Sequence, residues 1–144
     1  MNKPQIFCGY FFESNIADQM LRITGSEHKS PAHYEVPVEM EKLITYYHAN
    51  SGRLHPVLPA ADMHWMPAGI HPFIDGNGRT SRLLINLILI RSGYVIANLK
   101  SDLQSRLGYY QSLEEVRVNL QTVPFRKPVL KKVIEGPEEY KSML

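Results

Sequence analysis

One apolar segment constrains the fold of this chain more than any other feature of its sequence. Between Arg79 and Arg91 the chain reads TSRLLINLILI, with leucine or isoleucine at every position from Leu83 to Ile90 except Asn86. The run is far shorter than the roughly 18 residues that span a bilayer, and a helix that is apolar on all sides is buried among other elements. We therefore expect a helix over 79–91 at the centre of a bundle, with Gly93 at its carboxyl end.

Two further helices are expected before this segment. The first begins at Val36, with proline at its first position, and ends near Asn50. Its apolar residues share one face at helical spacing: Met40, Leu43, Ile44 and Tyr47. The second begins at Pro59, and Pro67 should kink or end it because proline lacks an N–H group.

Helices are also expected after the apolar segment. Ser101 caps one of them, and its apolar stripe comprises Leu103, Leu107, Tyr110 and Leu113. A short helix over 128–134 should be ended by Gly136. An alternating stretch over 20–24 predicts a short strand. The expected fold is therefore all-α with one small hairpin.

Composition excludes several classes of protein. The chain has 144 residues, 44% hydrophobic and 21% charged, which is ordinary for one globular domain. The net charge is +2 and the basic residues are scattered, so we expect no nucleic-acid partner. The sequence has one cysteine, Cys8, which excludes an internal disulfide framework. With no membrane span and no secretory signal in the sequence, we expect a cytoplasmic protein.

The segment HPFIDGNGRTSR, residues 71–82, concentrates the polar residues that could carry chemistry. Its turn Gly76-Asn77-Gly78 leads directly into the apolar helix, and the N–H groups at a helix start form an anion site together with the helix dipole. Arg79 and Arg82 project from the first turn of that helix, where guanidinium groups suit phosphate oxygens. The spacing therefore predicts a phosphate site.

Two residues of the same segment suit a phosphate-transfer reaction. Asp75 offers a hard oxygen ligand for Mg²⁺, which is usually bound by substrate phosphates together with one or two carboxylates. His71 is mostly neutral at pH 7 and can take a proton. Two other histidines, His55 and His64, are placed to pack or bond beneath this segment.

Residues 71–82 resemble the signature of the Fic domain family, His-Pro-Phe-x-(Asp/Glu)-Gly-Asn-Gly-Arg-x-x-Arg, at every specified position. The resemblance extends over roughly 17–120, and MLRITGSEHKSP is similar to the family's β-hairpin flap. It is closer to the adenylylating members than to the phosphorylating Doc branch, where a lysine commonly replaces Gly78. It implies a Fic-type helical bundle with a domain core over 17–120, an extension over 1–16 and a second, helical extension over 121–144.

The resemblance also implies an activity, which is transfer of AMP from ATP–Mg²⁺ to a Ser, Thr or Tyr hydroxyl of a target protein. His71 would be the general base, and Asp75 would coordinate Mg²⁺. The Asn77 side chain would bond the α-phosphate region, and two arginines would neutralise the β- and γ-phosphates. The nucleotide would thus be bound by Gly76, Asn77, Gly78, Arg79, Arg82 and, at the edge of the adenine pocket, Tyr109. Tyr110 is expected in the core.

The resemblance places target docking on the flap. Its residues Leu21, Arg22, Ile23 and Thr24 would align the target peptide by strand addition, in which main-chain bonds give affinity with little sequence demand. Two alternatives keep part of this interpretation. One is a phospho- or phosphocholine-transferase with the same fold, and the other is a non-catalytic nucleotide-binding or toxin–antitoxin-type module.

The sequence also gives expectations about regulation and assembly. Many Fic proteins carry an inhibitory helix of pattern (Ser/Thr)-x-x-x-Glu-(Gly/Asn), and the one glutamate here followed by Gly or Asn is Glu135. Lys131 stands where that pattern has Ser or Thr, so we expect no inhibitory helix of this kind within the sequence. We expect inhibition of the enzyme to come from an inhibitory partner in trans or from a segment outside this sequence. An uncovered apolar helix would favour a homo-oligomer.

Overall fold

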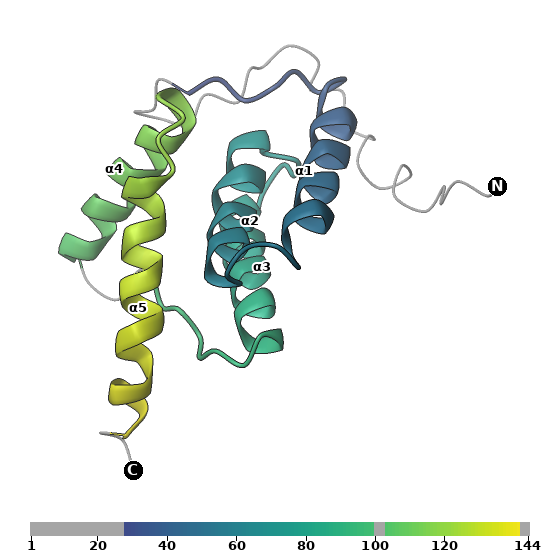
Figure 1. The fold of residues 1–144 in the computed structure, drawn as a ribbon. Coiled ribbons are helices and arrows are strands. Elements are labelled where there is room, and N and C mark those ends of the chain that lie inside the picture. Colours follow the sequence, from purple (N-terminus) through teal and green to yellow (C-terminus); the bar gives the residue numbers. More distant parts are fainter. Residues whose placement is uncertain (1–27, 100–102, 142–144) are drawn as a thin grey trace.

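The fold consists of five α-helices in a computed structural model that describes residues 28–99 and 103–141 (Figure 1). In chain order they are α1 (Val36–Asn50), α2 (Val57–Ile70), α3 (Asn77–Arg91), α4 (Leu103–Val118) and α5 (Val123–Lys141). The all-α prediction is confirmed for these residues. The strand and flap predicted near 20–24 lie outside them. None of the described helices is both long enough and apolar enough to cross a membrane.

Helix α2 occupies the centre of the molecule. It contacts all four other helices and lies between α1 on one side and the α4–α5 pair on the other (Figure 1). Ala60 and Ala61 are fully buried, and their small side chains allow neighbouring helices to pack closely against α2. Most residues from Val57 to Ile70 are buried, so α2 forms much of the core.

The prediction that the helix over 79–91 is buried on all sides is wrong. Among the described helices α3 contacts α2, and one neighbour covers one side of a helix. Ile85 and Leu89 are completely buried, whereas Leu83, Leu87 and Ile90 are 71%, 63% and 56% exposed. The helix ends as predicted, with Gly93 just beyond it at a φ of 84°.

Helix α1 has the predicted bounds, and α2 does not. Leu43 in α1 is buried as its spacing implies, but Ile44, predicted on the same face, is half exposed. Helix α2 begins at Val57 rather than Pro59 and continues through Pro67 to Ile70. Proline in this last turn removes one backbone hydrogen bond, and burial of the whole turn compensates for that loss.

Helix α5 is longer than predicted in both directions. It begins at Val123 and continues through Gly136 to Lys141, so the prediction that Gly136 ends it is wrong. A Cβ placed on Gly136 would lie 2.3 Å from Cγ2 of Val95. This glycine therefore lets α5 approach the segment that follows α3. The buried stripe of α5 follows helical spacing and comprises Phe125, Val129 and Val133.

The two adjacent tyrosines of α4 have the opposite burial from that predicted. Tyr110 was expected in the core and is 55% exposed, whereas Tyr109 is 7% exposed. The buried stripe of α4 is formed by Tyr109, Leu113 and Val116, at i, i+4 and i+7 spacing. Leu113 belongs to both the predicted and the observed stripe, but the observed one includes Tyr109 in place of Tyr110. Helix α4 packs against both α2 and α5.

A buried carboxylate connects three helices. Asp62 of α2 is 1% exposed, and its oxygens accept hydrogen bonds from Arg126 of α5 at 2.6 and 3.0 Å and from Trp65 Nε1 at 3.0 Å. The Tyr46 hydroxyl of α1 also donates to it. A buried charge is stable when it is paired and its lone pairs are satisfied. This network therefore fixes α1 and α5 against the helix that leads into His71.

Candidate active site

His71 lies at the point where α2 gives way to the loop that leads to α3. Its backbone is left-handed, with φ 58° and ψ 53°, and its N–H group bonds the Pro67 carbonyl. The ring nitrogen Nδ1 lies 3.2 Å from the Ala68 carbonyl oxygen, which can only accept a hydrogen bond. Nδ1 is therefore the protonated nitrogen of the neutral ring, and Nε2 keeps a lone pair that can take a proton.

Asn77 holds the loop between the two helices closed. Its side chain is 5% exposed; its Oδ1 accepts from the Phe73 N–H at 2.9 Å and its Nδ2 donates to the Phe73 carbonyl at 2.6 Å. The amide thus bonds both the N–H and the carbonyl group of Phe73, and we refer to this pair of hydrogen bonds as the clamp. The clamp fixes the position of the loop relative to the first turn of α3.

The amino end of α3 is open to a ligand. Gly76 has a φ of 86°, and no side chain among the described residues caps the helix there. The first N–H groups of a helix have no partner within the helix, and together with the helix dipole they attract anions. The geometry at Gly76, Asn77 and Gly78 is therefore compatible with anion binding.

Asp75 and Arg79 lie together at the solvent-exposed edge of this site. The Asp75 carboxylate accepts from the Gly76 N–H at 2.6 Å and pairs with Arg79 at 2.7 Å, with the two side chains 87% and 70% exposed. Both therefore remain within reach of a ligand in solution. Such an exposed ion pair is weak, so a phosphate can replace its carboxylate as the partner of Arg79.

The described residues include no group of three or more His, Cys, Asp or Glu side chains that could hold a metal ion. One exposed carboxylate, Asp75, is nevertheless what Mg²⁺ requires when phosphates supply its other ligands. The site thus fits a metal ion that arrives with a nucleotide. It does not fit a metal ion held by the protein alone.

Arg82 lies deeper in the site than Arg79. Its Nη1 is 3.7 Å from the position of a Cβ on Gly78, and its charge, like that of Arg117, acts on the buried hydroxyl of Tyr109. That hydroxyl also lies 2.8 Å from Nε2 of His64. His64 thus bonds Tyr109 of α4, a contact that depends on how α2 and α4 pack and that no local motif encodes.

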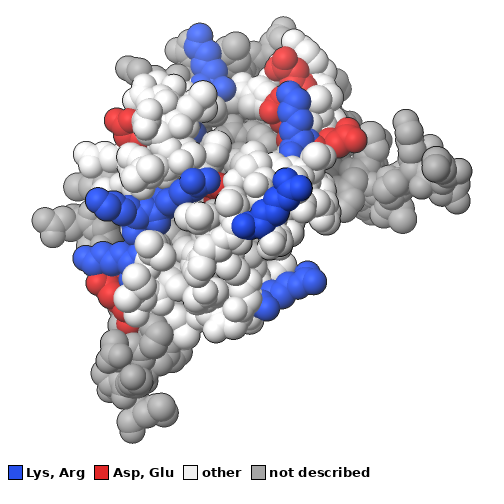
Figure 2. Space-filling model, in the orientation of Figure 1, with Lys and Arg blue, Asp and Glu red and all other residues white. Residues whose placement is uncertain are grey.

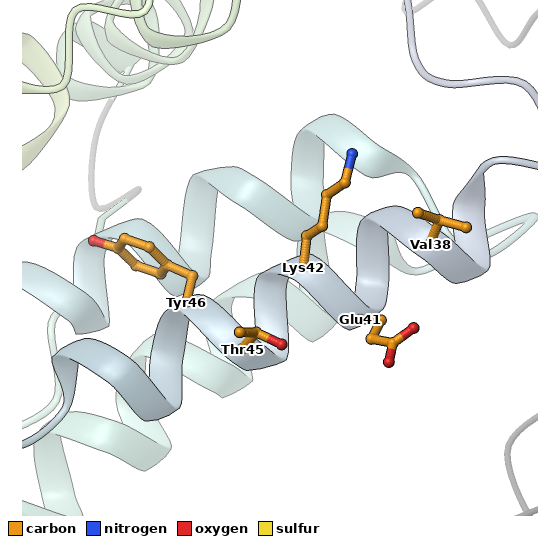
Figure 3. Close-up of a pocket in the computed structure, with 5 residues that line it drawn as sticks. All are labelled: Val38, Glu41, Lys42, Thr45 and Tyr46. Atoms are coloured by element: carbon orange, nitrogen blue, oxygen red, sulfur yellow. The ribbon is translucent and has the colours of Figure 1, made fainter.

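Among the described residues, other features outside the loop do not form a second site. Basic side chains are spread over the face shown in Figure 2 rather than gathered in one patch. A shallow hollow on α1 is lined by Val38, Glu41, Lys42, Thr45 and Tyr46, and these side chains point in different directions from a single helix (Figure 3). Glu135 pairs with Lys131 and Lys132 on α5. The flap residues lie outside the described part of the chain.

The loop and the helices that hold it define the class of protein. The pattern of the Fic/DOC family matches residues 5–89, which is more than half of the chain. The chain belongs to this family.

Individual relatives agree with this assignment. The chain is 42% identical over 88 residues to a protein adenylyltransferase Fic of Drosophila willistoni, covering 60% of this chain and 17% of that protein. It is 52% identical over 64 residues to the Drosophila grimshawi protein of the same name, covering 44% of this chain and 13% of the relative. The chain therefore spans less than a fifth of the length of these curated relatives.

Solved structures share the fold. Caenorhabditis elegans Fic-1, residues 134–508, superimposes with a TM-score of 0.70 at 31% identity, covering 80% of this chain and 34% of that one. A Fic domain-containing signalling protein of Bacteroides thetaiotaomicron gives a TM-score of 0.58 at 32% identity, covering 74% of this chain and 42% of that one. The helices described above are therefore those of a Fic fold.

Proposed function

We propose that this chain is a protein adenylyltransferase, which transfers AMP from ATP to a hydroxyl group of a target protein. The observation that carries the proposal is the juxtaposition in the 71–82 loop. A histidine with a free Nε2 lone pair shares this short loop with an open helix amino end flanked by two arginines. The curated relatives named above carry the same activity in their names.

In the proposed reaction His71 acts at Nε2. The target hydroxyl attacks the α-phosphorus, and its proton passes to Nε2 as the new P–O bond forms. The bridging bond between the α-phosphorus and the β-phosphate oxygen breaks, and pyrophosphate leaves. The Ala68 carbonyl holds the ring in the required tautomer and stabilises the protonated imidazole that results.

The phosphates would be bound at the amino end of α3. The backbone N–H groups of Asn77 and Gly78 would donate to them, and the Gly76 N–H would join them by exchanging its bond to Asp75. The positive guanidinium groups of Arg79 and Arg82 would offset the charge that develops on pyrophosphate. The Asn77 side chain already bonds Phe73. Its contribution to the α-phosphate would therefore be mainly indirect, through the shape of the loop.

Asp75 would hold the Mg²⁺ ion that accompanies the nucleotide. The metal would supply charge neutralisation on the phosphate oxygens. To bind it, Asp75 would exchange its contact with Arg79, which a surface pair permits at little cost. Tyr109 stays our candidate for the edge of the adenine pocket, and Leu21, Arg22, Ile23 and Thr24 stay our candidates for target docking within a domain core over 17–120.

Mass spectrometry of the chain incubated with ATP and Mg²⁺ in a cell lysate tests the proposal. We expect AMP on serine, threonine or tyrosine of the chain itself or of lysate proteins, and none with His71→Ala. Addition of phosphate or phosphocholine would indicate the transferases of the alternative interpretation. Nucleotide binding without any covalent change would indicate a non-catalytic module.

A further inference from the structure

Two histidines bond the carbonyl groups at the end of α2. The last four carbonyl groups of a helix have no partner within the helix itself. In α2 the Pro67 carbonyl accepts from the His71 N–H at 3.0 Å, and the Ala68 carbonyl oxygen lies 3.2 Å from Nδ1 of the same residue. The next carbonyl oxygen, that of Gly69, lies 3.0 Å from Nε2 of His28. Hydrogen bonds therefore hold three successive carbonyl groups of the turn that leads into the loop.

His28 reaches this turn from a distant part of the sequence. It lies 41 positions before Gly69, in the half-buried segment that passes the carboxyl end of α2 on its way to α1 (Figure 1). A Cβ placed on Gly69 would lie 3.5 Å from His28 Nε2 and 3.8 Å from Cγ of Arg117 in α4. Side chains from two other parts of the fold thus contact the last turn of α2.

The chemistry of the two groups gives the bond between His28 and Gly69 its direction. A carbonyl oxygen can only accept, so Nε2 of His28 carries the proton and donates it. A histidine that donates here satisfies an end carbonyl, and the helix dipole favours a donor of this kind at a carboxyl end. His28 therefore caps α2 from outside the helix.

The state of His71 depends on this turn. Its backbone has a φ of 58°, which a residue other than glycine adopts only when surrounding contacts fix it. Its Nδ1 bond requires the Ala68 carbonyl, one residue before Gly69, to keep its position. If the turn loosens, the His71 ring exchanges between its two tautomers. Nε2 then carries a proton for part of the time and cannot take one from a hydroxyl.

We propose that His28 is a positioning residue, whose bond to the Gly69 carbonyl holds the end of α2 and so keeps His71 in the tautomer with a free Nε2. This inference rests on the proposed function, which makes His71 the base. His28 lies far outside the motif over 71–82, so its role follows from the fold and not from the motif.

NMR of the imidazole ¹⁵N nuclei in the whole chain measures the His71 tautomer without any nucleotide. At about pH 8, where imidazole is neutral, the His71 signals, assigned by their loss in His71→Gln, should show a protonated Nδ1 in the wild type. His28→Leu, which removes the donor, should give a mixture of tautomers, and His28→Ala serves if His28→Leu folds poorly. His28→Gln, whose amide can donate to the same carbonyl, should restore the single tautomer. His33→Leu, at an exposed histidine of the same segment, is the matched control and should change nothing. An unchanged His71 tautomer in His28→Leu and His28→Ala would overturn the proposal.

The rate of AMP transfer from labelled ATP, with ATP affinity measured by calorimetry, separates this proposal from the proposed function. His28→Leu should lower the rate about three- to tenfold, as expected for loss of one hydrogen bond, and change ATP affinity less than twofold. His28→Gln should recover most of the rate. A loss of ATP affinity as large as the loss of rate would overturn the positioning role. A wild type that shows the expected tautomers and transfers no AMP would support the bond to Gly69 and contradict the proposed function alone.

Discussion

Single contacts decide the chemistry available to each residue of the 71–82 loop. His71 offers a free Nε2 because the Ala68 carbonyl occupies Nδ1, and Asn77 shapes the loop because both ends of its amide bond Phe73. The sequence identified both residues from their place in a motif. The clamp and the tautomer depend on the angles of a folded loop, so the pattern of residue types could not predict them.

Asp75→Asn should abolish the enhancement of ATP binding by Mg²⁺, because the loop loses its anionic ligand. The amide oxygen can still accept from Gly76, so the loop should keep its shape. Calorimetry with ATP, in the presence and absence of Mg²⁺, measures the effect. Glu41→Gln, which removes an exposed carboxylate from α1, is the control. Equal enhancement in Asp75→Asn and the wild type would exclude Asp75 as the ligand.

Two tyrosines should make the chain unstable in alkaline solution. Burial raises the pKa of both Tyr46 and Tyr109 from 10.0 to about 12, and the bond to Asp62 adds to the effect at Tyr46. Because the folded-state pKa lies above the unfolded one, the stability from these shifts is complete below pH 10 and disappears as the pH rises to 12. Urea unfolding across this range measures it. The decline should be shallower in Tyr46→Phe, and an equal decline would contradict the assignment to Tyr46.

At the scale of helices, local sequence signals predicted where α1 begins and ends. They could not predict which other helices pack against a given helix. Helix α1 has the predicted bounds because proline at its start and the Asn50-Ser51-Gly52 turn at its end act locally. Burial of α3 was overestimated because it depends on how many helices surround it. The end of α5 was misplaced at Gly136, since a glycine that usually ends a helix here serves a close contact with Val95.

The close approach of α5 to Val95 at Gly136 can be tested by substitution. Gly136→Ala should lower the free energy of unfolding by about 1–3 kcal/mol, the usual cost of overpacking, because the added Cβ would lie 2.3 Å from Val95 Cγ2. Val95→Ala in the same chain should recover most of the loss. Chemical denaturation of both single variants and the double variant measures the coupling. Stabilisation by Gly136→Ala alone would show that α5 does not approach Val95 so closely.

At the scale of the whole molecule, α2 carries the active loop at its carboxyl end and is fixed by every other described helix. The chain spans 17% of the Drosophila willistoni relative and 34% of the C. elegans chain, so the shared part is the unit that holds the loop. The sequence motif and its resemblance predicted this unit correctly as an all-α Fic fold. Apolar content alone could not identify the central helix of this unit. Small residues such as Ala60 and Ala61 allow other helices to pack closely around α2, and α2 rather than the more apolar α3 therefore occupies the centre.

We propose that the chain self-associates through the exposed apolar face of α3. Leu83, Leu87 and Ile90 lie on this face at helical spacing and are mostly exposed, and such a patch favours association. Light scattering at micromolar concentration should give a mass above that of one chain. Leu87→Lys should reduce the mass to that of one chain, whereas Glu41→Lys on α1 should not. A wild type that is monomeric at this concentration would contradict the proposal.

The central claim is that the 71–82 loop transfers AMP with His71 as the base. Its most direct test is the rate of AMP transfer from labelled ATP by the wild type and by His71→Ala, with ATP affinity measured in parallel by calorimetry. A positioned base contributes roughly 10²- to 10⁴-fold in rate, so we expect a loss of that size with ATP affinity nearly unchanged. Retention of more than about a tenth of the wild-type rate would contradict this account, because no base of that strength would then act at His71.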